Sequence, residues 1–599
     1  MKKWVALMLT VMLFLGICGN SFAAMKYDTL TVGTTTPFTG NFFSDVFGHN
    51  IADMDVQQLV HGYSPVYWNP TAGSFLYNST VISGTRYMDD PAGNRTYYLA
   101  LCDDLYFSNG EQITAWDYAF SLLLLCSKEM AEITGNTSIK PEISGCDNYR
   151  TGKVAFLRGV HVYSDTQLSI TIDADYRPYY YEVAVLDVVP YPISLLAPGC
   201  TVRDDGNGVY LDGELSAETL NKKLTDDRNG YISHPSVSSG PYTMVSYKDG
   251  IVTLKVNPYF KGNYNALKPK IENIVYRCCN NEDMLQELVT GKVDFLTRCT
   301  RKEIIDRGME LVQQGEFLME SYPRSGYSFF SFCCEKDTVA DIEVRKAIAM
   351  SIDKDAIVEA YVGDYGLRVD GDYGIGQWMY LKTANEPDEE TEEEKENVEP
   401  VGSPAQILEQ AGWVKDTDGI RYKLIDDEKV RLELKAIYPE GNMIGELLQD
   451  NLINPLRRNG IQLTAEAVPM ADLLNYYYRF AERDCDMIYL ATNFSMVYDP
   501  TSNFDPNEND TVSNTTGLKD QKLYDLALAM RQTQPGQVNT YTERWKAYQE
   551  RWTEMIPLIP VYSNIYYDFY VPTLQDYNGD NEYGWADAIL GAYLGDRSE

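Results

Sequence analysis

Histidine and basic side chains are scarce in this sequence. It has four His among 599 residues, and its 51 Lys and Arg against 87 Asp and Glu give a formal net charge of −36. A nucleic-acid-binding protein needs a basic face, and no basic cluster is visible along the chain. We therefore predict no nucleic-acid partner, and we expect the acidic surface to give solubility and to repel anionic surfaces.

The scarcity of histidine also argues against several enzyme classes. His49, His61, His161 and His234 show neither H-x-x-H nor H-E-x-x-H spacing, and the chain contains no G-x-S-x-G and no C-x-x-C segment. We therefore predict no metal site, no cofactor and no enzymatic activity. Carboxylate pairs are too abundant to be excluded by sequence, so a secreted hydrolase stays as an alternative.

Long apolar runs are absent except at the N-terminus. There Lys2 and Lys3 precede the apolar stretch 4–15, which is too short to span a bilayer comfortably. The S-F-A triplet that ends at Ala23 fits a cleavage site, so we predict a secretory signal peptide over 1–23. The alternative is a lipoprotein, in which the L-G-I-C segment places a lipid anchor on Cys18. Both interpretations give an extracytoplasmic protein, periplasmic or at the cell surface.

Length, cysteine and tyrosine set further limits. A chain of 599 residues exceeds a single core, so two or three domains are expected. The 11 Cys are too sparse for a disulfide scaffold, and their disulfide state stays open.

Most of the 46 Tyr are expected in strands. The clusters 179–181, 476–478 and 566–567 are candidates for a ligand cleft, because Tyr joins an apolar ring to a polar tip.

The most informative segment is 96–125. Alternating side chains over 96–102 predict a strand, and Asn109-Gly110 is the favoured dipeptide of a type I′ turn. Thr114 then caps a Leu-rich helix, with Asp117 at the N3 position of a capping box. The residues alone predict a strand, a turn and a helix.

This segment resembles the signature of family 5 solute-binding proteins, the peptide- and nickel-binding receptors that serve ABC importers. Other segments resemble elements of that family in the same order along the chain. They are 159–172, 190–194, 239–247, 257–260, 291–295, 341–357, 403–413 and 555–562. The resemblance covers about 30–599.

The resemblance implies an α/β fold with two mixed-sheet lobes, a periplasmic-binding-protein-like fold of type II, cluster C. Lobe I is expected over 24–62, 188–328 and 561–599, with a satellite domain over 63–187. Lobe II is expected over 329–560, and its segment 386–399 is an acid-rich loop. Two strands are expected to cross a hinge, near 327–331 and near 560–563.

The resemblance also implies a function. The protein is expected to be a monomer that captures a peptide or peptide-like ligand between the lobes, closes around it, and delivers it to an ABC permease and ATPase complex. A receptor that senses a peptide without uptake is the alternative. Nickel or haem, which some members bind, is not expected, because the chain has few His.

Peptide-binding members place an Asp against the α-ammonium of the ligand, in a segment that corresponds here to 489–504. The position falls on Met496, or on Asn493 if a short insertion is allowed, and neither side chain carries a charge. A buried ammonium without a counter-ion costs several kcal/mol. Either Asp499 serves instead, or the ligand lacks a free amine. The alternative interpretation of Asp499 is a turn cap before Pro500, with no ligand contact.

The full set of candidate ligand-binding residues follows from this correspondence, from the loop 35–42 and from the hinge. The candidates are Thr35, Phe38, Phe42, Tyr327, Phe329, Asn493, Phe494, Ser495, Met496, Tyr498, Asp499 and Tyr562. Arg345, in the segment 341–357, is not among them, because we interpret it as a helix-surface ion pair rather than a ligand contact.

Overall fold

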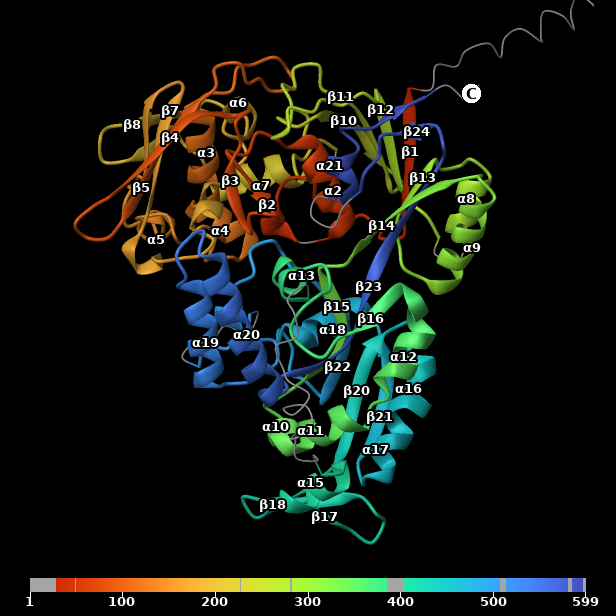
Figure 1. Ribbon diagram of the computed structural model, residues 1–599. Helices are drawn as coiled ribbons and strands as arrows, with labels where there is room; N and C mark the ends of the chain where they lie inside the picture. Colours follow the sequence, from red (N-terminus) through yellow and green to blue (C-terminus); the bar gives the residue numbers. More distant parts are fainter. Residues whose placement is uncertain are drawn as a thin grey trace, which may run out of the picture.

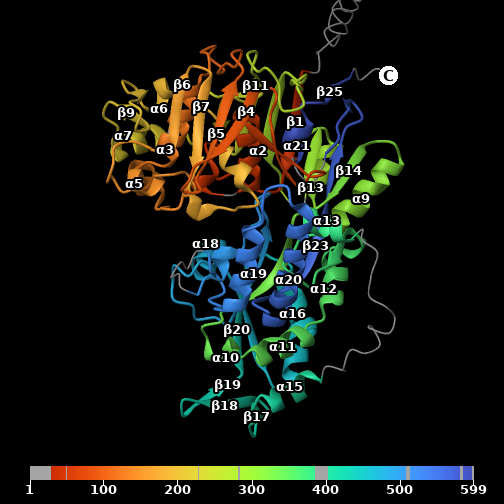
Figure 2. The ribbon, with the colours of Figure 1, turned by 60° about the vertical axis from the view of Figure 1, so that its left-hand side comes forward.

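The computed structural model describes residues 28–595 except His49, Asp227, 281–282, 385–401, 507–512 and 580–583. The predicted signal peptide and the acid-rich loop 386–399 lie outside the described residues. Figures 1 and 2 show an upper body and a lower body joined by a narrow set of strands. Within the described ranges, no helix combines the length and the apolar character needed to cross a membrane.

One mixed sheet of twelve strands runs through both bodies. Its order is β10-β11-β12-β1-β13-β23-β15-β22-β20-β21, and β14 and β16 pair with β23 off this path. Strands of the upper body are β1 (Thr29–Thr34), β10 (Tyr242–Lys248), β11 (Ile251–Val256), β12 (Asn273–Cys278), β13 (Phe295–Cys299) and β14 (Leu318–Pro323). Strands of the lower body are β15 (Gly326–Phe332), β16 (Gly366–Arg368), β20 (Glu433–Pro439), β21 (Gln462–Val468) and β22 (Met487–Asn493).

The long strand β23 (Leu558–Tyr570) belongs to both bodies. Up to Asn564 it pairs with β15 and β16, and from Ile565 onward it pairs with β14 and β13. The other crossing, which comes first along the chain, is at Arg324 and Ser325, which separate β14 from β15. Two strand connections therefore form the hinge, as predicted, but the first lies a few residues before the expected 327–331.

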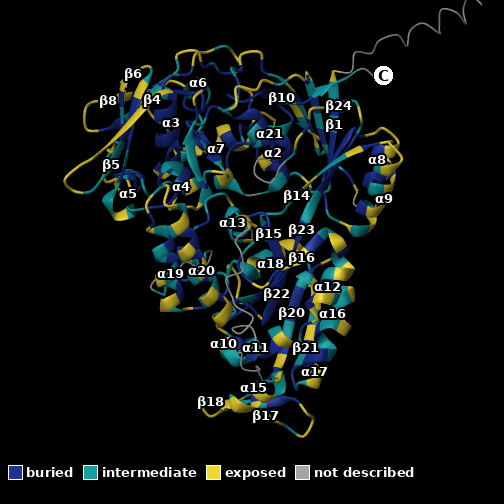
Figure 3. Ribbon diagram, viewed as in Figure 1, coloured by how far each residue is buried: buried dark blue, intermediate teal, exposed yellow. Residues whose placement is uncertain are grey.

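Helices cover the two faces of this sheet. In the upper body they are α2 (Ile51–Val60), α8 (Met284–Val289), α9 (Lys302–Gln313) and α21 (Gly584–Ala588). In the lower body they are α10 (Asp337–Ala340), α11 (Ile342–Ser351), α12 (Lys354–Tyr361), α13 (Trp378–Ala384), α15 (Pro404–Gln410), α16 (Ile444–Leu448), α17 (Asn454–Arg458), α18 (Met470–Tyr477), α19 (Gln521–Arg531) and α20 (Val538–Met555). Figure 3 shows buried residues in dark blue along the central strands.

Small sheets complete the two bodies. The hairpins β2 (Val66–Asn69) with β3 (Ser74–Tyr77) and β24 (Leu574–Gln575) with β25 (Tyr593–Leu594) belong to the upper body. The three strands β17 (Val414–Lys415), β18 (Arg421–Ile425) and β19 (Glu428–Arg431) form the lowest part of the molecule in Figure 1.

A second core in the upper body contains the segment 96–125. Its sheet has the order β4-β5-β7-β6, formed by β4 (Ile82–Asp89), β5 (Arg95–Leu101), β6 (Val160–Ser164) and β7 (Gln167–Ile172). Tyr97, Leu99 and Leu101 are buried, which confirms the predicted alternation. Helices α3 (Ala115–Leu125), α4 (Lys128–Thr134) and α5 (Cys146–Arg150) belong to this part.

The predicted capping box is present at α3. The backbone N–H and hydroxyl of Thr114 donate to the Asp117 carboxylate at 2.8 and 2.9 Å. The predicted type I′ turn is wrong, because only Gly110 of the Asn109-Gly110 pair has positive φ. The N–H of Gly110 donates to the carbonyl of Phe107, so Gly110 follows a turn centred on Ser108 and Asn109.

The elements that share this second core extend past residue 187. Helix α3 packs against the hairpin of β8 (Thr201–Asp204) and β9 (Val209–Asp212), and α4 packs against α7 (Ala217–Thr225). The short helix α6 (Ile193–Leu196) precedes them. The predicted domain boundaries themselves stay a prediction.

Arg345 on α11 differs from its predicted role. Its side chain is 1% exposed, and it donates to the carbonyls of Val339, Ala340, Met555 and Ile556 rather than to a carboxylate. The surface ion pair is therefore wrong. Arg345 instead satisfies the free carbonyls at the end of α20, where the chain turns through Ile556 with φ of 46°.

Candidate functional site

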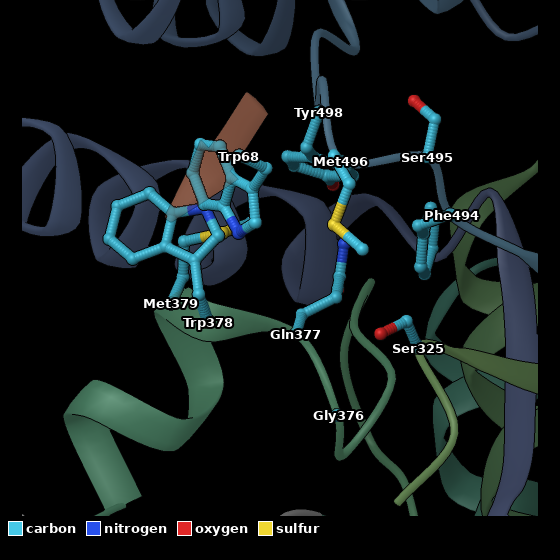
Figure 4. Close-up of a pocket in the computed structure, with 10 residues that line it drawn as sticks. All are labelled: Trp68, Ser325, Gly376, Gln377, Trp378, Met379, Phe494, Ser495, Met496 and Tyr498. Atoms are coloured by element: carbon cyan, nitrogen blue, oxygen red, sulfur yellow. The ribbon is translucent and has the colours of Figure 1, made fainter. Parts of the chain in front are cut away.

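A small pocket lies where the two bodies and the hinge meet (Figure 4). Its upper-body member is Trp68 of β2, and Ser325 comes from the hinge. The lower body contributes the start of α13 and the segment after β22, namely Gly376, Gln377, Trp378, Met379, Phe494, Ser495, Met496 and Tyr498. The volume is about 20 Å³, which holds a single water molecule. A solute can occupy this place only if the bodies move apart.

Backbone hydrogen bonds tie the pocket walls to the hinge. The N–H of Phe494 donates to the Ser325 carbonyl at 2.7 Å, and the N–H of Gly376 donates to the Arg324 carbonyl at 2.9 Å. Gly374 allows this close approach, because a Cβ at that position would lie 2.1 Å from the backbone nitrogen of Gly326. A movement at the hinge therefore displaces both walls.

A buried carboxylate, Asp372, lies behind the pocket. It is 6% exposed and accepts hydrogen bonds from the hydroxyls of Tyr327 and Tyr498 at 2.6 Å and from the hydroxyl of Tyr548 at 2.9 Å. Burial raises the pKa of Asp372, and the three tyrosine hydroxyls partly offset this by lowering it. The side chain amide of Gln549 donates to the Asp372 backbone carbonyl at 2.9 Å and fixes the loop. Sequence reasoning missed this residue.

Asp499 is engaged by groups of the protein itself. Its Oδ2 lies 3.6 Å from Nε of Arg531, and its Oδ1 accepts from the backbone N–H and the hydroxyl of Thr501 at 3.1 and 2.5 Å. The bonds to Thr501 are those of a turn cap before Pro500. A role of Asp499 in ligand binding stays a prediction.

An aromatic contact joins the bodies next to the pocket. Tyr180 and Tyr181 of the upper body lie against Trp378 and Tyr541 of the lower body. The indole N–H of Trp378 donates to the Tyr181 hydroxyl at 3.4 Å. The sequence singled out the cluster 179–181, and the structure places it in this contact.

Four of the predicted site residues line the pocket together: Phe494, Ser495, Met496 and Tyr498. Tyr327 touches the pocket residue Phe494, with 5.4 Å between the ring centroids. Asn493 is exposed at the end of β22, and its side chain oxygen accepts from Nε of Arg324 at 2.6 Å.

The remaining candidates lie outside the pocket lining. Thr35 follows β1 and is half-buried. Phe42 is buried in the core of the upper body, and Phe38 is half-buried against Phe42 and Tyr247. Phe329 is buried in the lower body, and Tyr562 is buried against Tyr361. The structure therefore brings together the segment 494–498 but not the loop 35–42. Trp68 and Trp378 were missed, because no motif marks them.

No group of three or more His, Cys, Asp or Glu in the described part of the chain has an arrangement able to hold a metal ion. The ten cysteines found there are unpaired.

Comparisons with known proteins agree with this architecture. The family model described as bacterial extracellular solute-binding proteins, family 5 Middle, matches residues 88–515. The probable D,D-dipeptide-binding periplasmic protein DdpA of Escherichia coli K12 is 22% identical over 186 residues, 31% of this chain and 34% of that protein. The oligopeptide-binding protein OppA of Bacillus subtilis 168 is 24% identical over 269 residues, 44% of this chain and 43% of that protein. These matches span less than half the length of either relative.

Several solved structures resemble nearly the whole chain, among them two that hold a peptide. The oligopeptide-binding protein AppA from Bacillus subtilis, in complex with a nonapeptide, has a TM-score of 0.67 at 15% identity, and the match covers 95% of this chain and 99% of that one. Lactococcal OppA, complexed with an endogenous peptide in the closed conformation, has a TM-score of 0.68 at 13% identity, with 94% and 100% covered. At these identities the likeness concerns the fold.

Proposed function

Because this chain belongs to the family 5 bacterial extracellular solute-binding proteins, we propose that it captures a peptide or peptide-like solute between its two bodies and delivers it to the permease of an ABC importer. The observation that carries the proposal is the pocket at the hinge, whose lining comes from both bodies. A solute held there contacts Trp68 above and Phe494, Met496 and Tyr498 below. Its binding therefore favours an arrangement in which both bodies close on the solute.

The mechanism is a change of population and needs no covalent chemistry. With two strand crossings the bodies separate by rotation about the hinge. A ligand that binds only between closed bodies shifts the equilibrium by its difference in affinity for the two states. The permease, with its ATPase, recognises the closed form, and the binding protein acts as a monomer in the extracytoplasmic space. Phe38 and Thr35 are proposed to reach a larger ligand from the upper body.

Mass spectrometry of the small molecules released from the freshly purified, denatured protein tests the proposal. We expect short peptides or related amides in stoichiometric amount. If the purified protein carries no solute of this class and binds none that is added to it, the proposal is contradicted. Uptake of the identified solute into vesicles that contain the permease and ATPase then distinguishes transport from a sensing role. A separate measurement, the intact mass of the exported protein, distinguishes cleavage at Ala23 from lipidation at Cys18.

A further inference from the structure

The carboxylate of Asp372 has no cationic partner among the described residues. Every side chain that bonds to it is neutral: the hydroxyls of Tyr327, Tyr498 and Tyr548. Asp55 in the upper body shows the ordinary arrangement, because its two oxygens pair with the Arg298 guanidinium at 2.7 Å. A buried charge is costly unless a partner offsets it. Asp372 is therefore a buried carboxylate whose side-chain partners are all neutral, and the three hydroxyls that donate to it stabilise its charged form against the effect of burial.

The Asp372 carboxylate acts on the pocket through Tyr498. Tyr498 lines the pocket (Figure 4). Its hydroxyl donates to the Asp372 carboxylate at 2.6 Å. A hydroxyl that donates to an anion becomes more electron-rich, and so does the ring that carries it. Because the site excludes most water, the field of the carboxylate is weakly screened there.

The rest of the lining suits a cation and contains no cationic side chain that would pair with an anion. Trp68, Trp378 and Phe494 present aromatic rings, and aromatic faces attract cations. The polar members are Gln377 and serines, and no lining residue carries a charge. A positively charged group would thus gain ring faces and the field of Asp372, whereas a carboxylate would find no guanidinium or ammonium in the lining.

Two other positions are less suited to this task. Met496, at the position expected to face an ammonium, is uncharged, and Asp499 is offset by Arg531 at 3.6 Å. We propose that Asp372, acting through Tyr498, makes the pocket selective for a ligand that carries a positive charge. This inference rests on the proposed solute-binding function and names the ligand class. Asp372 is a specificity-determining residue that acts through another side chain, so it need not touch the ligand.

The test uses choline and its uncharged isostere 3,3-dimethylbutan-1-ol, which differ in one charge and share a shape. Isothermal titration of the full exported chain at neutral pH gives the ratio of the two dissociation constants. We expect the wild type to bind choline at least tenfold more tightly. Asp372→Asn keeps the shape and an acceptor for Tyr327, and should reduce the ratio to threefold or less without changing the affinity for the alcohol.

Two further variants complete the design. Tyr498→Phe removes the hydroxyl that links the ring to Asp372 and should also reduce the ratio, which keeps the test decisive if Asp372→Asn does not fold. Asp520→Asn is the matched control, because it changes a carboxylate of the lower body that already pairs with Arg551 at 2.6 Å, and it should keep the wild-type ratio.

The proposal is overturned if the wild type shows no preference for choline or does not bind it, if Asp372→Asn keeps the preference, or if Asp520→Asn abolishes it. These failures differ from failure of the proposed function. A protein that carries bound peptides but lacks the preference for choline remains a solute-binding protein without this specificity. A protein that binds neither peptides nor either probe loses both assignments.

Discussion

The ring of Tyr180 stacks on the ring of Tyr541, with 4.1 Å between their centroids and 25° between their planes. Tyr180 comes just before the short helix η3 (Glu182–Leu186), which packs against β2 and β3 of the upper body, and Tyr541 belongs to α20 of the lower body. The backbone N–H of Tyr180 also donates to the Arg531 carbonyl at 2.9 Å, and its hydroxyl donates to the Gly73 carbonyl at 2.5 Å. The bodies are therefore held together by direct contact beside the pocket as well as by the two hinge strands.

Replacing Tyr541 with Leu should make the ligand-free protein more open. An aromatic pair contributes about 0.5–1.5 kcal/mol beyond its buried area, which changes a two-state population ratio by roughly two- to tenfold. Small-angle scattering of the ligand-free variant should give a larger radius of gyration than the wild type. Tyr247→Leu is the control, because its ring contacts lie within the upper body, and it should leave the radius unchanged. Equal radii for wild type and Tyr541→Leu would contradict the prediction.

Asp499→Asn should change ligand affinity by less than threefold. One of the sequence-based alternatives, in which Asp499 faces the ligand ammonium, predicts a loss of tenfold or more for binding of free-amine peptides by the Ala variant, about 1.4 kcal/mol. In the structure the Arg531 guanidinium and Thr501 account for both oxygens. Fluorescence titration with the peptide that copurifies with the protein measures the effect. A tenfold loss for a free-amine peptide, absent for its N-acetylated form, would restore the sequence-based assignment.

The sequence predicts a contact when its partners are close together along the chain, and misses it when they are far apart. The capping box of Thr114 and Asp117 is local, so the residues specify it directly. Asp372 bonds with Tyr327, Tyr498 and Tyr548, which are 45, 126 and 176 positions away. Such a cluster exists only after the lower body has folded, and no local pattern marks it.

The same distinction explains the loop 35–42 and Arg345. Phe42 is apolar and follows a strand, and both features are expected of a residue in a cleft wall and of a residue in a core. Its packing against Tyr247 shows that it belongs to the core. The carbonyls that hold Arg345 include those of Met555 and Ile556, more than 200 positions away. A charged residue on a helix looks exposed until such distant acceptors are known.

Arg345→Lys should destabilise the lower body although the charge is kept. The planar guanidinium reaches carbonyls on two sides, at Val339 and Ala340 and at Met555 and Ile556, whereas an ammonium cannot span both. Each buried carbonyl left without a donor costs about 1–3 kcal/mol, so we expect a loss of roughly 2–4 kcal/mol. The midpoint of urea unfolding measures it.

The neighbouring residue on α11 gives the control for this measurement. Lys346 forms a partly exposed ion pair with Glu343 at 2.9 Å, so Lys346→Ala should lower the free energy of unfolding by less than about 1 kcal/mol. If Arg345→Lys lowered the free energy of unfolding by no more than Lys346→Ala does, the four carbonyl contacts would not stabilise the fold.

Asp568 on the hinge strand β23 should make stability depend on pH in the acidic range. Its side chain is fully buried and accepts from the Tyr577 hydroxyl and the Arg298 backbone N–H at 2.5 and 2.8 Å. Burial raises the pKa of Asp568 to about 6 in the folded protein, above the 3.8 of an exposed Asp. The folded state therefore binds the proton more tightly than the unfolded chain.

The sign of the effect follows from this difference. The stabilising contribution is complete below the unfolded pKa and is lost as the pH rises through about 6. Asp568→Asn removes the dependence, so the unfolding free energy of the wild type minus that of the variant should fall by on the order of 2 kcal/mol between pH 4 and pH 7. Asp117, whose pKa burial also raises to about 6, is present in both proteins and cancels in the difference. Urea titrations across this range measure it, and parallel curves for the two proteins would mean that Asp568 has the same proton affinity folded and unfolded.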